Sequence, residues 1–154
     1  MFLRSRIKSD HKVELERNIS HFGLEKSQFL KKEMDIILYK KHSVKSACIP
    51  VIELKALVMQ DKARPISVFN MVKDLKFLEQ LKHTGRFDCY FLLITDHRGY
   101  YSGSMNAGKL LSDISRQEIH GCYRANNESL YLSQKYHIIW KDVNATQKFF
   151  LLRI

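Results

Sequence analysis

The chain has 154 residues, of which 45% are apolar, so it is long enough to form one domain with a hydrophobic core. Its 26 Lys and Arg residues exceed its 16 Asp and Glu residues, and the net charge of +10 favours binding to polyanions such as nucleic acid, although solubility alone is a simpler explanation of that charge. No apolar stretch approaches the ~20 residues of a membrane span, and the basic segment 1–6 is not followed by the long apolar core of a secretory signal.

Three strands are predicted in the first third of the chain. Apolar and acidic residues alternate within residues 12–19, which favours a strand over a helix. A turn near Gly23 leads to an apolar strand over residues 33–40, and a charged loop leads to a third strand over residues 48–57. We therefore predict a β-meander whose last two strands carry acidic residues.

The clearest helix is opened by Pro65 and Ser67 and ends before Gly85. Ser67 is a reasonable N-cap residue, and Gly85 is a typical C-terminal stop. Lys73 and Lys76 lie away from the apolar face of this helix. Apolar residues recur on that face at the spacing i, i+3, i+4 and i+7, and they are Val68, Met71, Val72, Leu75, Leu78 and Leu81.

The second half of the chain contains further strands and one short helix. Residues 87–95 are nearly all apolar, which is typical of a central strand covered on both faces. A shorter helix is predicted over residues 107–118, and two strands over residues 136–141 and 148–154. No linker, repeat or low-complexity segment divides the chain, so we predict a single domain over residues 1–154.

Two opposite charges lie inside the apolar run of residues 51–57. Glu53 and Lys55 are two residues apart, so on a strand their side chains point to the same face. Burying both groups is costly unless they pair or bind an ion. Asp35 on the preceding strand is placed to join Glu53 around a hard divalent cation with Lys55 beside it, an arrangement suited to phosphodiester hydrolysis. The structural alternative is an ordinary Glu–Lys pair on an exposed strand face, worth at most about 1 kcal/mol.

The order of these elements resembles the PD-(D/E)XK superfamily of restriction-endonuclease-like nucleases. The resemblance covers about residues 12–97: a strand, a strand with Asp35, a strand with Glu-Leu-Lys at 53–55, a helix and a buried strand. The chain is similar in detail to an uncharacterised restriction-like group within that superfamily. The resemblance implies an α/β restriction-endonuclease-like fold, which is a mixed central sheet flanked by helices. Acid-x-Lys also occurs at 10–12 and 74–76, so the apolar strand around residues 53–55 is what distinguishes that motif.

The resemblance also implies roles for individual residues. Asp35 would be the first acid of the motif, Glu53 the second acid and Lys55 the catalytic lysine. Asp35, Glu53 and the main-chain carbonyl of Leu54 would bind Mg²⁺ (or Mn²⁺), which lowers the pKa of a bound water and neutralises charge on the phosphate. Lys55 would hold or deprotonate the attacking water, or stabilise the transition state.

Further residues are expected around this site. The superfamily usually begins with a helix that often supplies another acid, but fewer than a dozen residues precede the first predicted strand. Either that helix is reduced here, or a partner or an alternative start supplies it. Glu14 or Glu16 on the first strand is a candidate for the further acid. Gln60 lies shortly after the motif, where related nucleases sometimes place a polar side chain near the substrate. Gln60, Lys73 and Lys76 are candidate contacts to nucleic acid, although an ordinary loop glutamine is the simpler explanation of Gln60.

Three cysteines complete the set of residues with distinctive chemistry. Cys48, Cys89 and Cys122 are widely spaced and form no C-x-x-C pair, which indicates reduced interior thiols of a cytoplasmic protein and argues against a disulfide framework or a zinc site.

These features favour a metal-dependent endonuclease that hydrolyses phosphodiester bonds of nucleic acid and has no membrane partner. DNA is the preferred substrate, although the sequence does not separate DNA from RNA. Cleavage of both strands of a duplex commonly uses two sites, which would make the protein a homodimer. The alternative function is that of a catalytically inactive module with a nuclease fold, which serves nucleic-acid binding or protein assembly.

Overall fold

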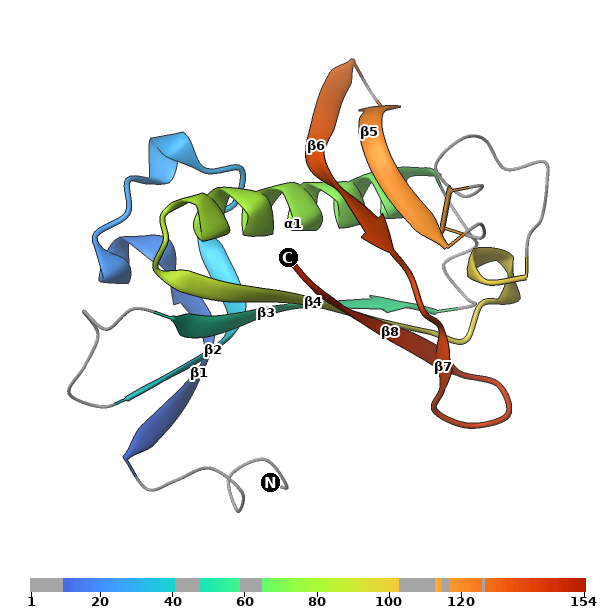
Figure 1. Cartoon of the computed structure of the whole chain (residues 1–154), viewed down its shortest axis with the longest axis horizontal. Helices are drawn as coiled ribbons and strands as arrows, with labels where there is room; N and C mark the ends of the chain where they lie inside the picture. Colours follow the sequence, from blue (N-terminus) through green and yellow to red (C-terminus); the bar gives the residue numbers. More distant parts are fainter. Residues whose placement is uncertain (1–9, 41–47, 59–64, 103–112, 115–116, 126) are drawn as a thin grey trace.

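A six-stranded mixed sheet forms one layer of the protein (Figure 1). The computed structural model describes residues 10–40, 48–58, 65–102, 113–114, 117–125 and 127–154. The strands of the sheet lie in the order β1 (His11–Asn18), β2 (Glu33–Lys40), β3 (Ile49–Leu57), β4 (Phe87–Thr95), β8 (Lys148–Arg153) and β7 (Lys141–Asp142). Neighbouring strands are antiparallel except β3 and β4, which are parallel. The first three strands thus form the predicted meander.

Helix α1 (Pro65–His83) connects the parallel strands β3 and β4, as a parallel pair requires. It crosses one face of the sheet, and the hairpin of β5 (Glu118–Ala125) and β6 (Glu128–His137) packs against its other side (Figure 1). Because it is enclosed by two layers, α1 buries more than a single stripe of side chains. Phe69 and Phe77 are buried in addition to the apolar residues predicted from the spacing.

The two faces of the sheet differ in burial. Along β4, every second residue from Phe87 to Thr95 is buried, whereas the residues between them are only partly buried. The prediction that this strand is covered on both faces is therefore wrong. On the uncovered face, Leu15, Leu54 and Leu151 expose between 43% and 67% of their surface. Besides α1, the described part of the chain is α-helical only at residues 113–114, so the fold is α/β but mostly sheet.

The ends of the elements show which local signals were reliable. Strands β2 and β4 begin and end at the predicted residues. Gly85 has a φ of +71°, and its N–H donates to the carbonyl of Lys82 at 2.9 Å, so it ends α1 as predicted. Ser67, in contrast, lies inside α1, which begins at Pro65. Of the three cysteines, Cys89 is buried while Cys48 and Cys122 are exposed, so the prediction of interior thiols holds for only one.

The hairpin was not predicted. Of the predicted helix over residues 107–118, residues 113–114 are helical, Glu118 instead begins a strand, and residues 107–112 and 115–116 lie outside the described part. The predicted strand 136–141 is instead the end of β6, at His137, followed by an irregular segment and the short strand β7.

A buried carboxylate joins α1 to the hairpin. Glu79 is 2% exposed, and it accepts hydrogen bonds from the main-chain N–H groups of Ser133 and Gln134, from the hydroxyl of Tyr136 and from the ammonium of Lys76. Burial by itself raises the pKa of Glu79, but the hydrogen bonds from Lys76, Ser133 and Tyr136 outweigh burial and hold the pKa below its usual range.

We expect Glu79→Gln to lower the free energy of unfolding by about 1–3 kcal/mol at pH 7, because an amide NH₂ would face main-chain donors. A carboxyl with a depressed folded-state pKa stabilises the protein fully above its unfolded pKa of about 4.3, and this stability is lost as the pH falls through the folded-state value. Urea unfolding from pH 7 to pH 3 measures the difference. Glu128→Gln, which alters an exposed ion pair with Lys73, is the matched control and should cost less than about 1 kcal/mol. An equal loss for Glu79→Gln at both ends of the pH range would contradict this account.

Candidate active site

Asp35 and Glu53 lie side by side where β2 and β3 stop pairing. The ladder between the two strands pairs Ile37 with Val51 and Ile36 with Ile52. At the next position the side chains take over the hydrogen bonding, because the N–H of Leu54 donates to Asp35 Oδ2 at 2.9 Å and the N–H of Asp35 donates to Glu53 Oε1 at 3.3 Å. The sheet backbone thus fixes one oxygen of each carboxylate.

Glu53 faces α1 and is completely buried. A carboxylate at such a position is costly unless positive groups surround it. Burial is the largest cause that raises the pKa of Glu53, and the charges of Asp35 and Asp74 add to it, whereas Lys31 lowers it; the result is a pKa of about 7.

Lys31, in the segment that precedes β2, supplies the counter-charge. Its ammonium forms an ion pair with Glu53, lies 3.0 Å from Asp74 Oδ1 and 3.8 Å from Asp35 Oδ1, and sits 5.6 Å from the centre of the Phe77 ring. Burial disfavours this charge, but Glu53 and Asp74 together hold the pKa of Lys31 well above its ordinary value. One ammonium therefore stands among three carboxylates.

Asp74 on α1 links the two lysines of the site. Its Oδ2 lies 3.3 Å from the ammonium of Lys55, while its Oδ1 contacts Lys31. Asp74 is only 8% exposed. We call the five side chains of Lys31, Asp35, Glu53, Lys55 and Asp74 the acid–lysine cluster; with every group ionised it carries three negative and two positive charges.

Gln80 holds the segment that carries Lys31. From α1, its side-chain carbonyl accepts the N–H of Leu30 at 3.0 Å, and its amide NH₂ donates to the carbonyl of Gln28 at 3.3 Å. The N–H of Ile19 also donates to the carbonyl of Lys32 at 2.9 Å. The backbone on either side of Lys31 is therefore fixed against the rest of the fold.

Sequence reasoning missed Lys31, Asp74 and Gln80. A signal for Asp74 did exist, since it lies three residues after Met71 and four before Leu78, which puts a carboxylate in the apolar stripe of α1. Asp74 also stands in acid-x-Lys spacing with Lys76, but on a helix and not on an apolar strand. Lys31 offers no local signal, because its place in the cluster depends on packing between distant segments.

The suggested additional acids do not join the cluster. Glu14 pairs with Lys12 at 2.5 Å and with Arg17 at 2.9 Å, both on its own strand. Glu16 is exposed and has a φ of +52°. Within the described part of the chain, no group of three or more His, Cys, Asp or Glu side chains is arranged to hold a metal ion.

The remaining donors still fit one hard cation. Carboxylate oxygens of Asp35 and Glu53 and the main-chain carbonyl of Leu54 are the oxygen ligands that Mg²⁺ prefers, and Mg²⁺ keeps several waters, so two carboxylates suffice. Both acids already attract a cation in this structure, namely the ammonium of Lys31.

The expected nucleic-acid contacts are engaged elsewhere. Lys73 pairs with Glu128 at 2.5 Å, and Lys76 pairs with Glu79 at 2.9 Å, so both ammoniums are neutralised by acids beside the hairpin. Gln60 lies outside the described residues.

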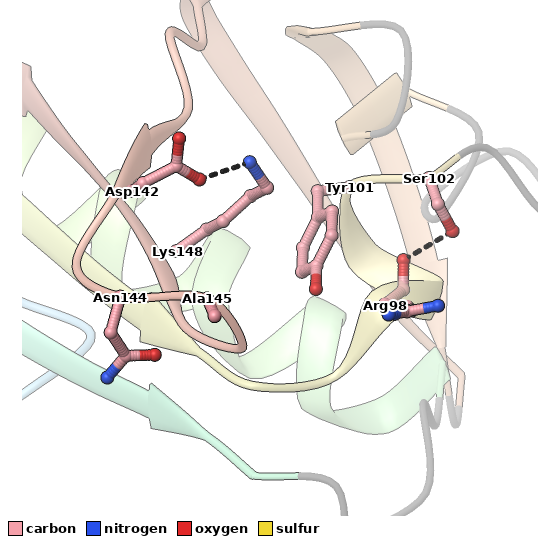
Figure 2. A pocket seen from close by; sticks show the side chains of 7 residues that line it. All are labelled: Arg98, Tyr101, Ser102, Asp142, Asn144, Ala145 and Lys148. Carbon is pink, nitrogen blue, oxygen red and sulfur yellow. Dashed lines mark hydrogen bonds and ion pairs between the residues drawn. The ribbon is translucent and has the colours of Figure 1, made fainter.

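A second basic feature lies at the end of β4 and beside the β7–β8 turn. A hollow of about 630 Å³ is lined by Arg98, Tyr101, Ser102, Asp142, Asn144, Ala145 and Lys148. Figure 2 shows the Tyr101 ring between the side chains of Lys148 and Arg98. Lys148 pairs with Asp142 at 2.5 Å and lies 5.3 Å from the ring centre of Tyr101. Asp142 neutralises Lys148 as Glu128 neutralises Lys73, so Arg98 is the group of this basic hollow that is suited to meet a phosphate.

Comparisons of the chain with protein-family models, with curated proteins and with solved structures found no match. Within the described residues, no helix combines the length and the apolar character needed to cross a membrane.

We expect Asp74→Asn to lower the free energy of unfolding by about 1–3 kcal/mol in buffer with EDTA, because two half-buried ammoniums lose a charged partner. The matched control is Asp142→Asn, whose exposed pair with Lys148 should contribute less than about 1 kcal/mol. Denaturant unfolding of both variants tests the difference. Equal stabilities of the two variants would show that Asp74 does not hold the cluster together.

Proposed function

We propose that the chain is a metal-dependent nuclease that hydrolyses phosphodiester bonds of nucleic acid, with DNA as the favoured substrate. The observation that carries this proposal is the meeting of Asp35 and Glu53 from adjacent strands, with Lys55 in the same cluster. The superfamily motif requires one acid on a strand, and a second acid two residues before a lysine on the neighbouring strand. Asp35 on β2, and Glu53 and Lys55 on β3, have these residue types and this spacing.

The topology supports the same proposal. A meander, a crossover helix and a parallel strand follow one another, and the two acids lie on the second and third strands of the meander. We propose on this basis that the α/β fold is of the restriction-endonuclease-like type, with residues 12–97 as its core.

In the proposed hydrolysis, different residues of the chain would have different roles. Asp35, Glu53 and the carbonyl of Leu54 would hold Mg²⁺ or Mn²⁺. Such an ion supplies an acidified water and neutralises charge on the phosphate. Lys55, oriented by Asp74, would donate a hydrogen bond to a phosphate oxygen or to the attacking water. Glu53 itself is shielded from bulk water, which strengthens the interaction of its carboxylate with a cation.

Nucleic-acid binding is the part of the proposal that the charge distribution supports. The net charge of +10 attracts phosphates, and the basic hollow adds a local contact through Arg98. A homodimer stays a prediction.

One observation favours the alternative of a catalytically inactive module. The ammonium of Lys31 already neutralises Glu53 and approaches Asp35, so the carboxylates form a stable arrangement with protein groups alone. Activity measurements decide between the two functions.

We expect Glu53→Gln and Lys55→Ala each to lower Mg²⁺-dependent cleavage of DNA by about 10²-fold or more, because each removes a charge next to the scissile phosphate. Cleavage of plasmid DNA and of labelled RNA with Mg²⁺ or Mn²⁺ measures this. Glu128→Gln and Lys135→Ala alter exposed ion pairs and serve as controls that should cleave like the wild type. A wild type that binds nucleic acid but cuts neither DNA nor RNA would favour the inactive module.

Binding to duplex DNA in EDTA should weaken steeply as salt rises, because phosphate contacts release counterions. We expect Arg98→Ala to reduce the slope of log affinity against log salt by about 0.9, the value for one lost phosphate contact. Lys73→Ala should change the slope less, since Glu128 already neutralises Lys73. Fluorescence anisotropy across a salt series measures all three proteins. A flat dependence for the wild type would mean that the net charge serves another purpose.

A further inference from the structure

Lys31 contacts the oxygens of Asp35 and Glu53 that the sheet leaves available. The N–H of Leu54 binds Asp35 Oδ2 and the N–H of Asp35 binds Glu53 Oε1, whereas Lys31 meets Asp35 Oδ1 and Glu53 Oε2. The two main-chain donors belong to the strands and stay in place as long as β2 and β3 do. A cation that binds both carboxylates therefore approaches the same oxygens as the ammonium of Lys31.

We propose that Lys31 and a divalent cation are alternative occupants of Asp35 and Glu53, so that metal binding displaces the Lys31 ammonium. The inference rests on the proposed function for the location of the metal site. Two positive charges repel strongly within a few ångströms in a buried place, so simultaneous occupancy is unfavourable. Lys31 thereby sets how tightly the site binds metal.

The geometry lets this exchange occur without unfolding. Gln80 and Ile19 fix the backbone on both sides of Lys31, so only its side chain has to move. Asp74 lies 3.0 Å from the Lys31 ammonium and is not among the proposed metal ligands, so it can keep Lys31 paired while the other two acids turn to the metal. Lys31 is bound by an acid in both states.

The substitution Lys31→Met would separate the charge of the side chain from its apolar packing. It keeps an apolar stem of similar length against Phe77 but removes the charge. In EDTA, Lys31→Met leaves three acids without that ammonium and should lower the Tm. With Mn²⁺, the same variant should bind the ion at least about tenfold more tightly than the wild type, because no ammonium has to be displaced.

The experiment is a calorimetric Mn²⁺ titration, together with thermal unfolding in EDTA and in saturating Mn²⁺. It uses the wild-type chain, Lys31→Met, Glu53→Gln and the control Lys135→Met, whose lysine pairs with exposed Glu118. Tighter binding by Lys31→Met, with a larger rise in Tm on adding Mn²⁺ than in the wild type and in Lys135→Met, supports the exchange. Mn²⁺ binding by Lys31→Met but not by the wild type supports it as well.

Other outcomes overturn the proposal. Equal or weaker Mn²⁺ binding by Lys31→Met, with binding abolished in Glu53→Gln, removes the exchange and leaves the proposed metal site standing. Unchanged binding in Glu53→Gln, or no binding by the wild type and Lys31→Met, removes the metal site and the exchange together.

A measurement on the wild type covers the case in which Lys31→Met does not fold. The ¹³Cε signal of Lys31, assigned with Lys31→Arg, should shift on saturation with Mg²⁺ more than that of Lys135. A Lys31 signal that stays in place while Mg²⁺ binds overturns the exchange.

Discussion

The fully buried carboxylate of Glu53 constrains the rest of the site. A charge in that position needs a counter-charge, and β3 alone provides none in contact with it, because Lys55 turns to Asp74 instead. The protein meets this need with Lys31, from a segment that must then be held against α1 by Gln80. The path of the chain before β2 and the presence of Asp74 and Gln80 in α1 are both linked to that one buried group.

The part of this arrangement that could be predicted is the part encoded in local patterns. Apolar runs located β2, β3 and β4, and with them Asp35 and Glu53. The face shared by Glu53 and Lys55 follows from strand geometry alone. Lys31 could not be found in this way, because it acts through contacts with residues 22 and 43 positions away, at Glu53 and Asp74.

The β5–β6 hairpin could not be predicted from the sequence for a related reason. Leu130 and Leu132 of β6 alternate as a strand should, but Ser133, Gln134 and Lys135 then interrupt the pattern with polar residues. The main-chain N–H groups of Ser133 and Gln134 are satisfied by Glu79, so polar residues there belong to a buried hydrogen-bonded junction with α1. The strand propensity of the β6 sequence does not reveal that its main chain bonds to an acid on α1. The same junction explains why α1 has polar residues on faces that the apolar spacing left to solvent.

The two buried acids of α1 show how a structural carboxylate differs from an exchangeable one. Glu79 is bound by main-chain donors of β6, by a tyrosine hydroxyl and by one lysine, and the main-chain donors cannot leave while the hairpin stays folded. Asp74, in contrast, is bound by the ammoniums of Lys31 and Lys55, which sit on long side chains with several rotatable bonds. Donors of the first kind fix an acid in place, whereas donors of the second kind can be replaced by another cation without moving the backbone. Asp35 and Glu53 combine the two kinds, because a main-chain N–H binds one oxygen of each and Lys31 contacts the other. Their second oxygens can therefore exchange a counter-ion while the first stay fixed, whereas Glu79 is suited to hold the layers together.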